Sequence, residues 1–259
     1  PPTSSGAACD TGKAFPLATE AAVRPFEARD RDDVVRICEE TAFCDRGAAQ
    51  LPCPGFVAAW FVRPYLDLEP RHAFVAVERG QEERVVGYVV GTPDTARFRR
   101  RSVPRALRIL AALAVASREP GPRRLLRWLA GPGRREAPRI PLDRYPAHLH
   151  FNVLPLARSR QLAGLLLHTV VASFGEGATC IHGVTTTRRG ESALPQRLMA
   201  LGVADGAQIL DETPSTFLPA VLGEQGEFVN RAWGVSIAEV LAVAARLQRP
   251  GLGRRSRPR

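Results

Sequence analysis

The hydrophobic pattern of the chain changes period several times, and the order of the periods predicts an α/β fold of the α+β type. Val85–Gly91 (VVGYVVG), His148–Leu154 (HLHFNVL) and Ile181–Thr187 are short runs bounded by turn residues, which favours strands. Arg160–Phe174, between the last two runs, is longer and strongly apolar, which favours a helix. Residues 147–174 are therefore expected to form a strand, a tight basic turn and a helix.

Similar patterns predict further elements on both sides of this unit. Asp30 precedes a run with helical spacing and is expected to cap that helix. The other expected elements, in chain order, are a short strand from Ala22, a helix over Gly55–Leu66, a hairpin of His72–Glu78 with Val85–Gly91, a helix over Glu191–Leu201, two short strands over Gln208–Leu210 and Thr216–Leu218, and a capped amphipathic helix over Ser236–Leu247.

Composition divides the chain into a leader, one large domain and an extension. Residues 1–20 are small and polar without periodicity, which predicts a disordered leader. Residues 21–218 are expected to form one domain with a mixed sheet of six to seven strands. Within it, residues 95–142 alternate arginine clusters with apolar helical runs and prolines, which predicts a basic helical insertion before the fourth strand. Residues 219–259 form a C-terminal extension with one helix and a basic tail.

The net charge of +10 favours anionic ligands, whether phosphates, nucleic acid or an acidic membrane. The five cysteines form no CxxC pair, so a reducing cytoplasm fits better than a disulfide scaffold. The N-terminus does not read as a signal peptide, and the longest apolar run, Ile109–Ala116, is far below the ~20 residues that span a bilayer. A soluble, cytoplasmic protein is expected.

The segment LPLARSRQLAGLLL (residues 154–167) carries the clearest chemistry. An apolar strand ends at a proline, and an Arg-Ser-Arg turn runs directly into a helix. Helix N-termini offer unpaired amide donors and the positive end of a dipole, and Arg158 and Arg160 add full charges. The arrangement predicts a pyrophosphate site; the alternative is two solvated arginines at the start of a surface helix.

At this point the chain resembles the GCN5-related N-acetyltransferase (GNAT) family. The order of elements agrees, and the family's pyrophosphate motif, Arg/Gln-x-x-Gly-x-Gly/Ala, falls on Arg158-Ser159-Arg160-Gln161-Leu162-Ala163. The stretch YPAHLHFNVLP is similar to a bacterial subgroup related to the acetyltransferase-like domain of some O-GlcNAc hydrolases. The resemblance covers about residues 22–218 and is specific over roughly 145–203.

The resemblance implies that acetyl-CoA, as cosubstrate, binds in a V-shaped gap between the strands at 148–154 and 181–187. Backbone groups of Phe151, Asn152 and Val153 would pair with the pantetheine. The amides of residues 158–163, which are Arg158, Ser159, Arg160, Gln161, Leu162 and Ala163, would hold the pyrophosphate. An amine would attack the acetyl thioester directly, and backbone amides near Val153 would polarise its carbonyl.

The sequence departs from the family pattern at two places. Gln161 replaces the middle glycine of the motif. In RGESALPQRLMALGV, the position of the tyrosine that commonly acts as general acid in the family falls on Arg197 or Leu198. Neither side chain can protonate a departing thiolate well. An inactive or weakened pseudo-acetyltransferase that acts as a binding or regulatory module is therefore the alternative function.

His148 and His150 alternate with apolar residues, so both face one side of their strand. One of them is the candidate general base for the acceptor amine, because an imidazole pKa of about 6.5 suits that role. The alternative is a hydrogen-bonded pair packed under the insertion. His182 is interpreted as a core residue, and Glu78, Glu82 and Glu83 as either a base from the hairpin or solvated carboxylates. No third ligand at a fitting spacing supports a metal site.

The insertion has three interpretations: a lid over the acceptor side of the gap, an interfacial helix at a membrane surface, or plain packing. Nucleic acid is not an expected partner, because the insertion lacks interleaved aromatics. The expected acceptor is a small-molecule or peptide amine. The segment after Pro219 either seals a homodimer or ends freely.

Overall fold

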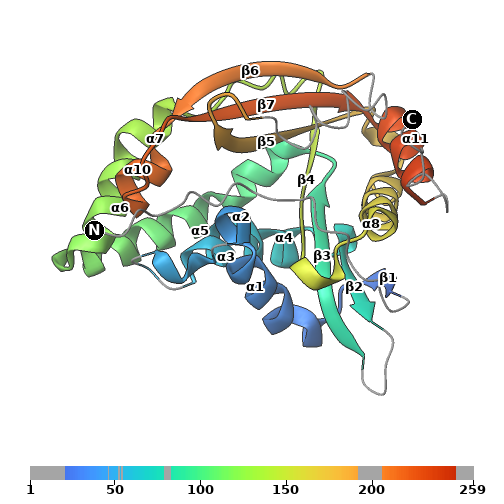
Figure 1. Ribbon diagram of the computed structural model, residues 1–259, viewed down its shortest axis with the longest axis horizontal. Helices are drawn as coiled ribbons and strands as arrows, with labels where there is room; N and C mark the ends of the chain where they lie inside the picture. Colours follow the sequence, from blue (N-terminus) through green and yellow to red (C-terminus); the bar gives the residue numbers. More distant parts are fainter. Residues whose placement is uncertain are drawn as a thin grey trace, which may run out of the picture.

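The computed structural model describes residues 21–45, 47–51, 53, 55–78, 83–191 and 206–248. Its centre is a seven-stranded mixed sheet in the order β1-β2-β3-β4-β5-β7-β6 (Figure 1). The strands are β1 (Ala21–Pro25), β2 (Ala73–Glu78), β3 (Arg84–Thr92), β4 (Ala147–Val153), β5 (Cys180–Arg188), β6 (Gln208–Ser215) and β7 (Phe228–Ser236). All neighbouring strands are antiparallel except β4 and β5, which are parallel.

Helices cover both faces of the sheet. They are α1 (Arg31–Glu40), α2 (Ala42–Asp45), α3 (Phe56–Phe61), α4 (Arg63–Leu68), α5 (Thr95–Val115), α6 (Pro120–Ala130), α7 (Pro132–Arg135), α8 (Arg160–Ala172), α10 (Phe217–Leu222) and α11 (Ile237–Gln248). One core lies between the sheet and α1, α3, α4, α5 and α6, and a second lies between the sheet and α8 with α11. The predicted α/β class and its mixed sheet of six to seven strands are confirmed.

The two cores explain the period of β4. Leu149, Phe151 and Val153 belong to the core under α8 and α11. His148 and His150 alternate with them and face α3, α4 and α5, as the strand's period of two requires. The predicted common face of the two histidines is confirmed.

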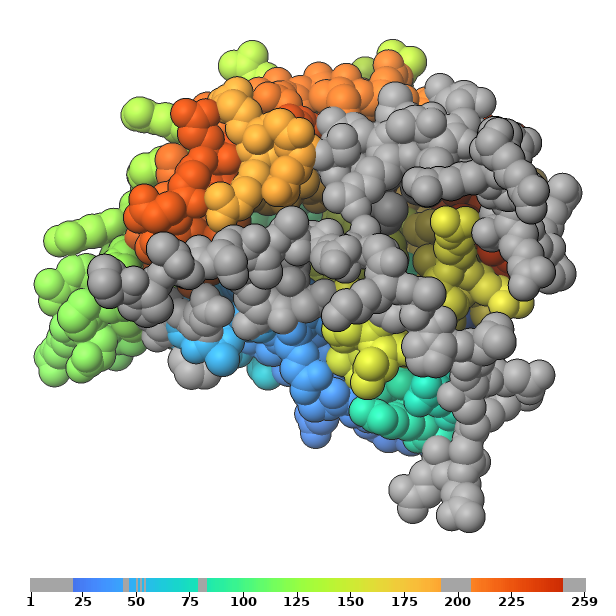
Figure 2. Space-filling model, viewed as in Figure 1, coloured from blue at the N-terminus to red at the C-terminus, as the bar shows by residue number. Residues whose placement is uncertain are grey.

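The basic insertion consists of α5, α6 and α7, as predicted. Its end is anchored by Glu136, whose buried carboxylate accepts a hydrogen bond from the Thr216 amide at 2.8 Å and another from the Thr216 hydroxyl. The Trp128 indole also donates to the Thr216 hydroxyl, at 3.1 Å. The insertion therefore connects the C-terminal end of β3 to the junction of β6 and α10, and its residues form one end of the molecule beside α10 (Figure 2).

The sequence predictions fail in the C-terminal part of the sheet. Gln208–Leu210 lies in one longer strand, β6, and Thr216–Leu218 is the beginning of α10 rather than a strand. β7, which was not predicted, is hydrogen-bonded between β5 and β6. Glycine, arginine and asparagine interrupt the hydrophobic alternation of β7, so its local pattern does not predict a strand. The predicted helix over Glu191–Leu201, with Arg197 and Leu198, lies outside the described residues except for Glu191.

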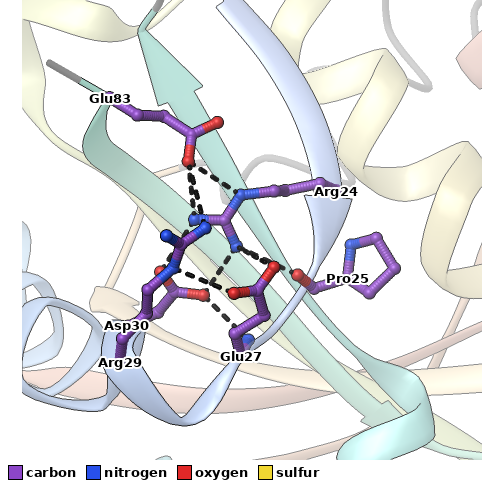
Figure 3. Close-up of polar contacts among 6 residues, drawn as sticks. All are labelled: Arg24, Pro25, Glu27, Arg29, Asp30 and Glu83. Carbon is purple, nitrogen blue, oxygen red and sulfur yellow. Dashed lines mark hydrogen bonds and ion pairs between the residues drawn. The ribbon is translucent and has the colours of Figure 1, made fainter.

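Two helix predictions need correction. The expected helix over Gly55–Leu66 is two short helices that meet at Val62, because Pro64 cannot donate to the preceding turn. Asp30 does not cap α1 with its side chain. Its carboxylate instead accepts from the Glu27 amide at 2.8 Å and from both terminal nitrogens of Arg24 at 2.7 and 2.8 Å (Figure 3).

Among the described residues, no helix combines the length and hydrophobicity needed to cross a bilayer. The same residues contain no group of three or more His, Cys, Asp or Glu side chains arranged to hold a metal ion.

Candidate active site

β4 and β5 separate almost as soon as they meet. The register pairs only Ala147 with Ile181 and His148 with His182, although β4 and β5 both continue for several residues. Within the described chain, no further β4–β5 pair follows. The two strands thus leave a V-shaped gap that is closed at His148 and open toward the end of β4.

The edge of β4 along this gap offers unused backbone groups. The Leu154 amide donates to the Val86 carbonyl at 2.8 Å. Because antiparallel pairs alternate, the N–H and C=O of Phe151 and Val153 point away from β3 and toward the gap, whereas those of Asn152 point toward β3. The Val153 carbonyl is taken by Nε of Arg158 at 3.0 Å. Among the described residues, nothing pairs with the backbone groups of Phe151 or with the Val153 amide, so these groups remain for a ligand. Asn152 contributes little backbone to the gap.

A short turn carries the chain from β4 into α8. Pro155–Ala157 form one 3₁₀ turn, and Ser159 then caps α8 by accepting the Leu162 amide at 3.0 Å. The Ala163 amide donates to the Ser159 carbonyl at 3.1 Å. The amides of Leu162 and Ala163 are therefore occupied. The candidate amide donors for an anion are then those of Ser159, Arg160 and Gln161, at the start of the predicted motif.

Those first residues keep the properties of an anion site. No partner among the described residues takes the amides of Ser159, Arg160 and Gln161, and the side chains of Arg160 and Gln161 are exposed. α8 is long enough, over Arg160–Ala172, to present a helix dipole at this end. The local geometry of the predicted strand, turn and helix is confirmed.

His148 is held at both ring nitrogens. Thr95 uses its only hydroxyl proton to donate to the Pro146 carbonyl at 2.6 Å, so its oxygen must accept from Nδ1–H of His148, also at 2.6 Å. Nε2 of His148 then accepts from the Tyr65 hydroxyl. Burial, with smaller contributions from His182 and Arg99, lowers the pKa of His148 to about 3. His148 therefore stays neutral and has no nitrogen left to receive a proton from an acceptor.

His150 is held at one nitrogen. Its Nδ1 lies 3.1 Å from the Tyr88 hydroxyl, which also accepts from the Asn152 side chain at 3.1 Å. Phe61 stacks on the ring with centroids 6.0 Å apart. No partner for Nε2 is found in the part of the chain that the structure describes. Burial lowers the pKa of His150 to about 4, so the ring is neutral at neutral pH. Nε2 is an acceptor in the tautomer whose Nδ1–H donates to the Tyr88 hydroxyl.

The other candidates from the sequence are His182 and the glutamates of the hairpin. His182 is buried, its Nδ1 donates to the Tyr145 carbonyl at 2.8 Å, and it is a core residue as predicted. The Glu83 carboxylate is paired with Arg24 at 3.0 Å, on the hairpin side of the sheet. Glu82 lies outside the described residues.

The partners of the two histidines were not predicted from the sequence. Tyr65, Tyr88 and Thr95 come from α4, β3 and the first turn of α5, and nothing in their local sequence marks them as polar partners. A buried tyrosine usually finds a hydrogen-bond partner, and this was the one signal available for Tyr65 and Tyr88.

The insertion forms a separate groove with α10. It has a volume of about 410 Å³ and is lined mainly by Arg123, Arg124, Arg127 and Trp128. None of the predicted site residues lines it.

The fold agrees with a solved structure. SsHAT, an acetyltransferase, superposes with a TM-score of 0.54 at 26% sequence identity, over 84% of this chain and 98% of SsHAT. This is a GNAT-like fold. No protein-family model matches the sequence. The GNAT-like fold and the similarity to SsHAT support a general acetyltransferase function, and agree with the family to which the strand, turn and helix pointed.

Proposed function

We propose that the chain is an N-acetyltransferase that transfers the acetyl group of acetyl-CoA directly to an amine. The observation that carries the proposal is the early separation of β4 and β5 in a GNAT-like fold, with the capped N-terminus of α8 at the open end of the gap. The relationship to the bacterial subgroup similar to O-GlcNAc hydrolase domains belongs to this proposal and rests on the stretch around His148–Val153.

The two ends of the gap supply different interactions. At the open end, the amides of Ser159, Arg160 and Gln161 and the Arg160 guanidinium would hold the pyrophosphate. Along β4, the Val153 amide would pair with the pantetheine near the turn. The backbone of Phe151, further toward the closed end, would pair with it and polarise the thioester carbonyl. The Gln161 side chain is exposed at the surface, so it would not block the approach of a phosphate to the backbone of the turn.

His150 is the proposed general base, and His148 is a positioning residue. The amine nitrogen attacks the thioester carbon, the C–N bond forms, and the C–S bond breaks. The amine loses one proton, which Nε2 of His150 accepts, and the departing sulfur takes up one proton. His148 instead ties β4 to Thr95 and Tyr65, which fixes the strand that carries His150.

Calorimetric titration of the full chain with acetyl-CoA tests the proposal. We expect binding, and we expect Arg160→Glu to weaken it at least tenfold because the substitution places a negative charge beside the pyrophosphate. Arg108→Glu, which makes the same charge change at an exposed site on α5, is the matched control and should leave the affinity within about twofold. Absence of binding to the wild-type chain at millimolar acetyl-CoA would refute the proposal.

The second candidate, a pseudo-acetyltransferase, is favoured by the low basicity of both histidines. It predicts acetyl-CoA binding without turnover in a broad screen of small-molecule and peptide amines. Turnover with any of these amines would exclude it.

A further inference from the structure

Two buried polar atoms on the face of β5 and β7 that α8 and α11 cover have no hydrogen-bond partner in the part of the chain that the structure describes. They are Nε1 of Trp233 on β7 and the hydroxyl oxygen of Thr185 on β5. Gly183 pairs directly with Trp233, and Thr185 lies two residues further along the same strand, so all three side-chain positions share one face. A buried polar group without a partner costs folding free energy, and proteins keep few of them.

The indole of Trp233 lies over β5. A Cβ atom at Gly183 would be 2.2 Å from Cζ2 and 2.6 Å from Cε2, the carbon bonded to Nε1. Only glycine at position 183 leaves room for the ring in this place. Because the sheet order is β4-β5-β7, the ring extends from β7 across β5 in the direction of β4 and the gap.

Both groups are close to the closed end of the gap. The last paired residue of β5 is His182, so Gly183 follows it by one position and Thr185 by three. The pyrophosphate turn is at the other, open end, after β4. A ligand that starts at the turn and runs along β4 would bring its acyl half to the strand that carries Thr185.

The chemistry of the pair selects the ligand group. An indole N–H can only donate, so its partner must be an acceptor, whereas a threonine hydroxyl can donate or accept. The acyl half of an acyl-CoA carries such acceptors as the carbonyl oxygens of the pantetheine amides and of the thioester. Resting on the proposed function, we propose that Trp233 and Thr185 are positioning residues that bind a carbonyl oxygen in the acyl half of acetyl-CoA.

Calorimetry on the full chain with three ligands tests this assignment. The ligands are acetyl-CoA, CoA and adenosine 3′,5′-bisphosphate, which lacks the pantetheine arm. Trp233→Phe and Thr185→Val remove the polar group and keep most of the shape. Each should weaken acetyl-CoA binding by about 3- to 10-fold, the value of one hydrogen bond, and leave the bisphosphate affinity unchanged. A parallel loss for CoA assigns a pantetheine amide, and a loss for acetyl-CoA alone assigns the thioester.

Thr186→Val is the matched control on β5. Its side chain lies on the opposite face, where its hydroxyl donates to the Asn230 side chain at 2.7 Å, so its removal should leave all three affinities within about twofold. Thr185→Val should also raise the melting temperature of the free protein while it weakens acetyl-CoA binding, because it removes an unsatisfied hydroxyl. A residue that only packs would not show this opposition.

The outcomes separate the two proposals. If the wild type binds acetyl-CoA and both variants bind it equally well, or if they lose bisphosphate binding to the same extent, the assignment of Trp233 and Thr185 is wrong and the proposed function stands. If the wild type binds none of the three ligands, the proposed function is itself refuted and the carbonyl assignment falls with it.

Discussion

Nδ1 of His148 and the hydroxyl of Thr95 lie 2.6 Å apart, and this contact joins β4 to the first turn of the basic insertion. Thr95 is almost completely buried, at 1% exposure, and also donates to the Pro146 carbonyl. Two segments about fifty residues apart in sequence are thereby fixed at the closed end of the gap.

Thr95→Val should therefore destabilise the chain. The substitution keeps the shape but leaves Nδ1–H of His148 buried without an acceptor, which costs about 1–3 kcal/mol of unfolding free energy. Urea denaturation measures the loss. Thr95→Ser keeps the hydroxyl and should lose less than half as much; equal stability of Thr95→Val and wild type would show that the contact contributes nothing.

Lowering the pH should destabilise the protein at pH values that are still above the range in which carboxylates titrate. Burial lowers the pKa of His148 to about 3 and of His150 to about 4, whereas both are about 6.5 in the unfolded chain. Between these values the unfolded state binds more protons, so stability falls as the pH drops from about 7 toward 4. Urea midpoints at pH 7 and pH 5 test the direction.

His150→Gln should reduce this dependence on pH, because it removes one of the two groups that must be protonated. His168→Gln, at an exposed position on α8, is the control and should leave it unchanged. A wild-type midpoint that is the same at pH 7 and pH 5 would contradict the prediction.

The proposed role of His150 as general base predicts a specific kinetic pattern. His150→Gln should lower kcat by about 10²–10⁴-fold with little change in the KM for acetyl-CoA, since a general base contributes in the transition state. Because the ring is already neutral, kcat/KM should show no inflection near pH 6.5 from this group. Initial rates between pH 5 and 9 with a productive amine measure both effects. Full activity of the variant would move the role of base to another group.

The Arg24–Asp30 ion pair should stabilise the N-terminal part of the sheet. Asp30 is 3% exposed, and its pKa is lowered: burial opposes the shift, but hydrogen bonds from Arg24 and the Glu27 amide outweigh burial (Figure 3). Asp30→Asn should cost about 3 kcal/mol, because it leaves Arg24 without its buried partner.

The pH dependence of this pair has the usual sign for a carboxylate with a lowered pKa. Its stabilisation is present above the unfolded value of 3.8 and disappears as the pH falls through the lower folded value. Asp33→Asn, which removes an exposed pair with Arg36, is the control and should cost less than about 0.5 kcal/mol. Chemical denaturation of both variants at pH 7 measures whether the Arg24–Asp30 pair contributes to the free energy of unfolding or leaves it unchanged.

Local sequence predicted most of the elements that surround the gap. The period of two in β4 placed His148 and His150 on one face, and the Arg-Ser-Arg turn before an apolar run predicted the start of α8. These predictions succeeded because hydrophobic periodicity and capping depend on neighbours a few residues apart. The same logic failed at Asp30, where a distant guanidinium competed with the helix amides, and at β7, whose polar interruptions hid the strand.

Patterns along the chain were enough to predict the α/β class, the basic insertion, and the strand, turn and helix over residues 147–174. The three-dimensional arrangement adds that β4 and β5 separate after His148 and that β7 lies between β5 and β6. It also shows that both ring nitrogens of His148 are bonded, whereas one nitrogen of His150 has no partner among the described residues. The physical reason is the range of the interactions. Strand order, burial and the hydrogen bonds from Tyr65, Tyr88 and Thr95 join residues that are far apart along the chain, so no local pattern encodes them.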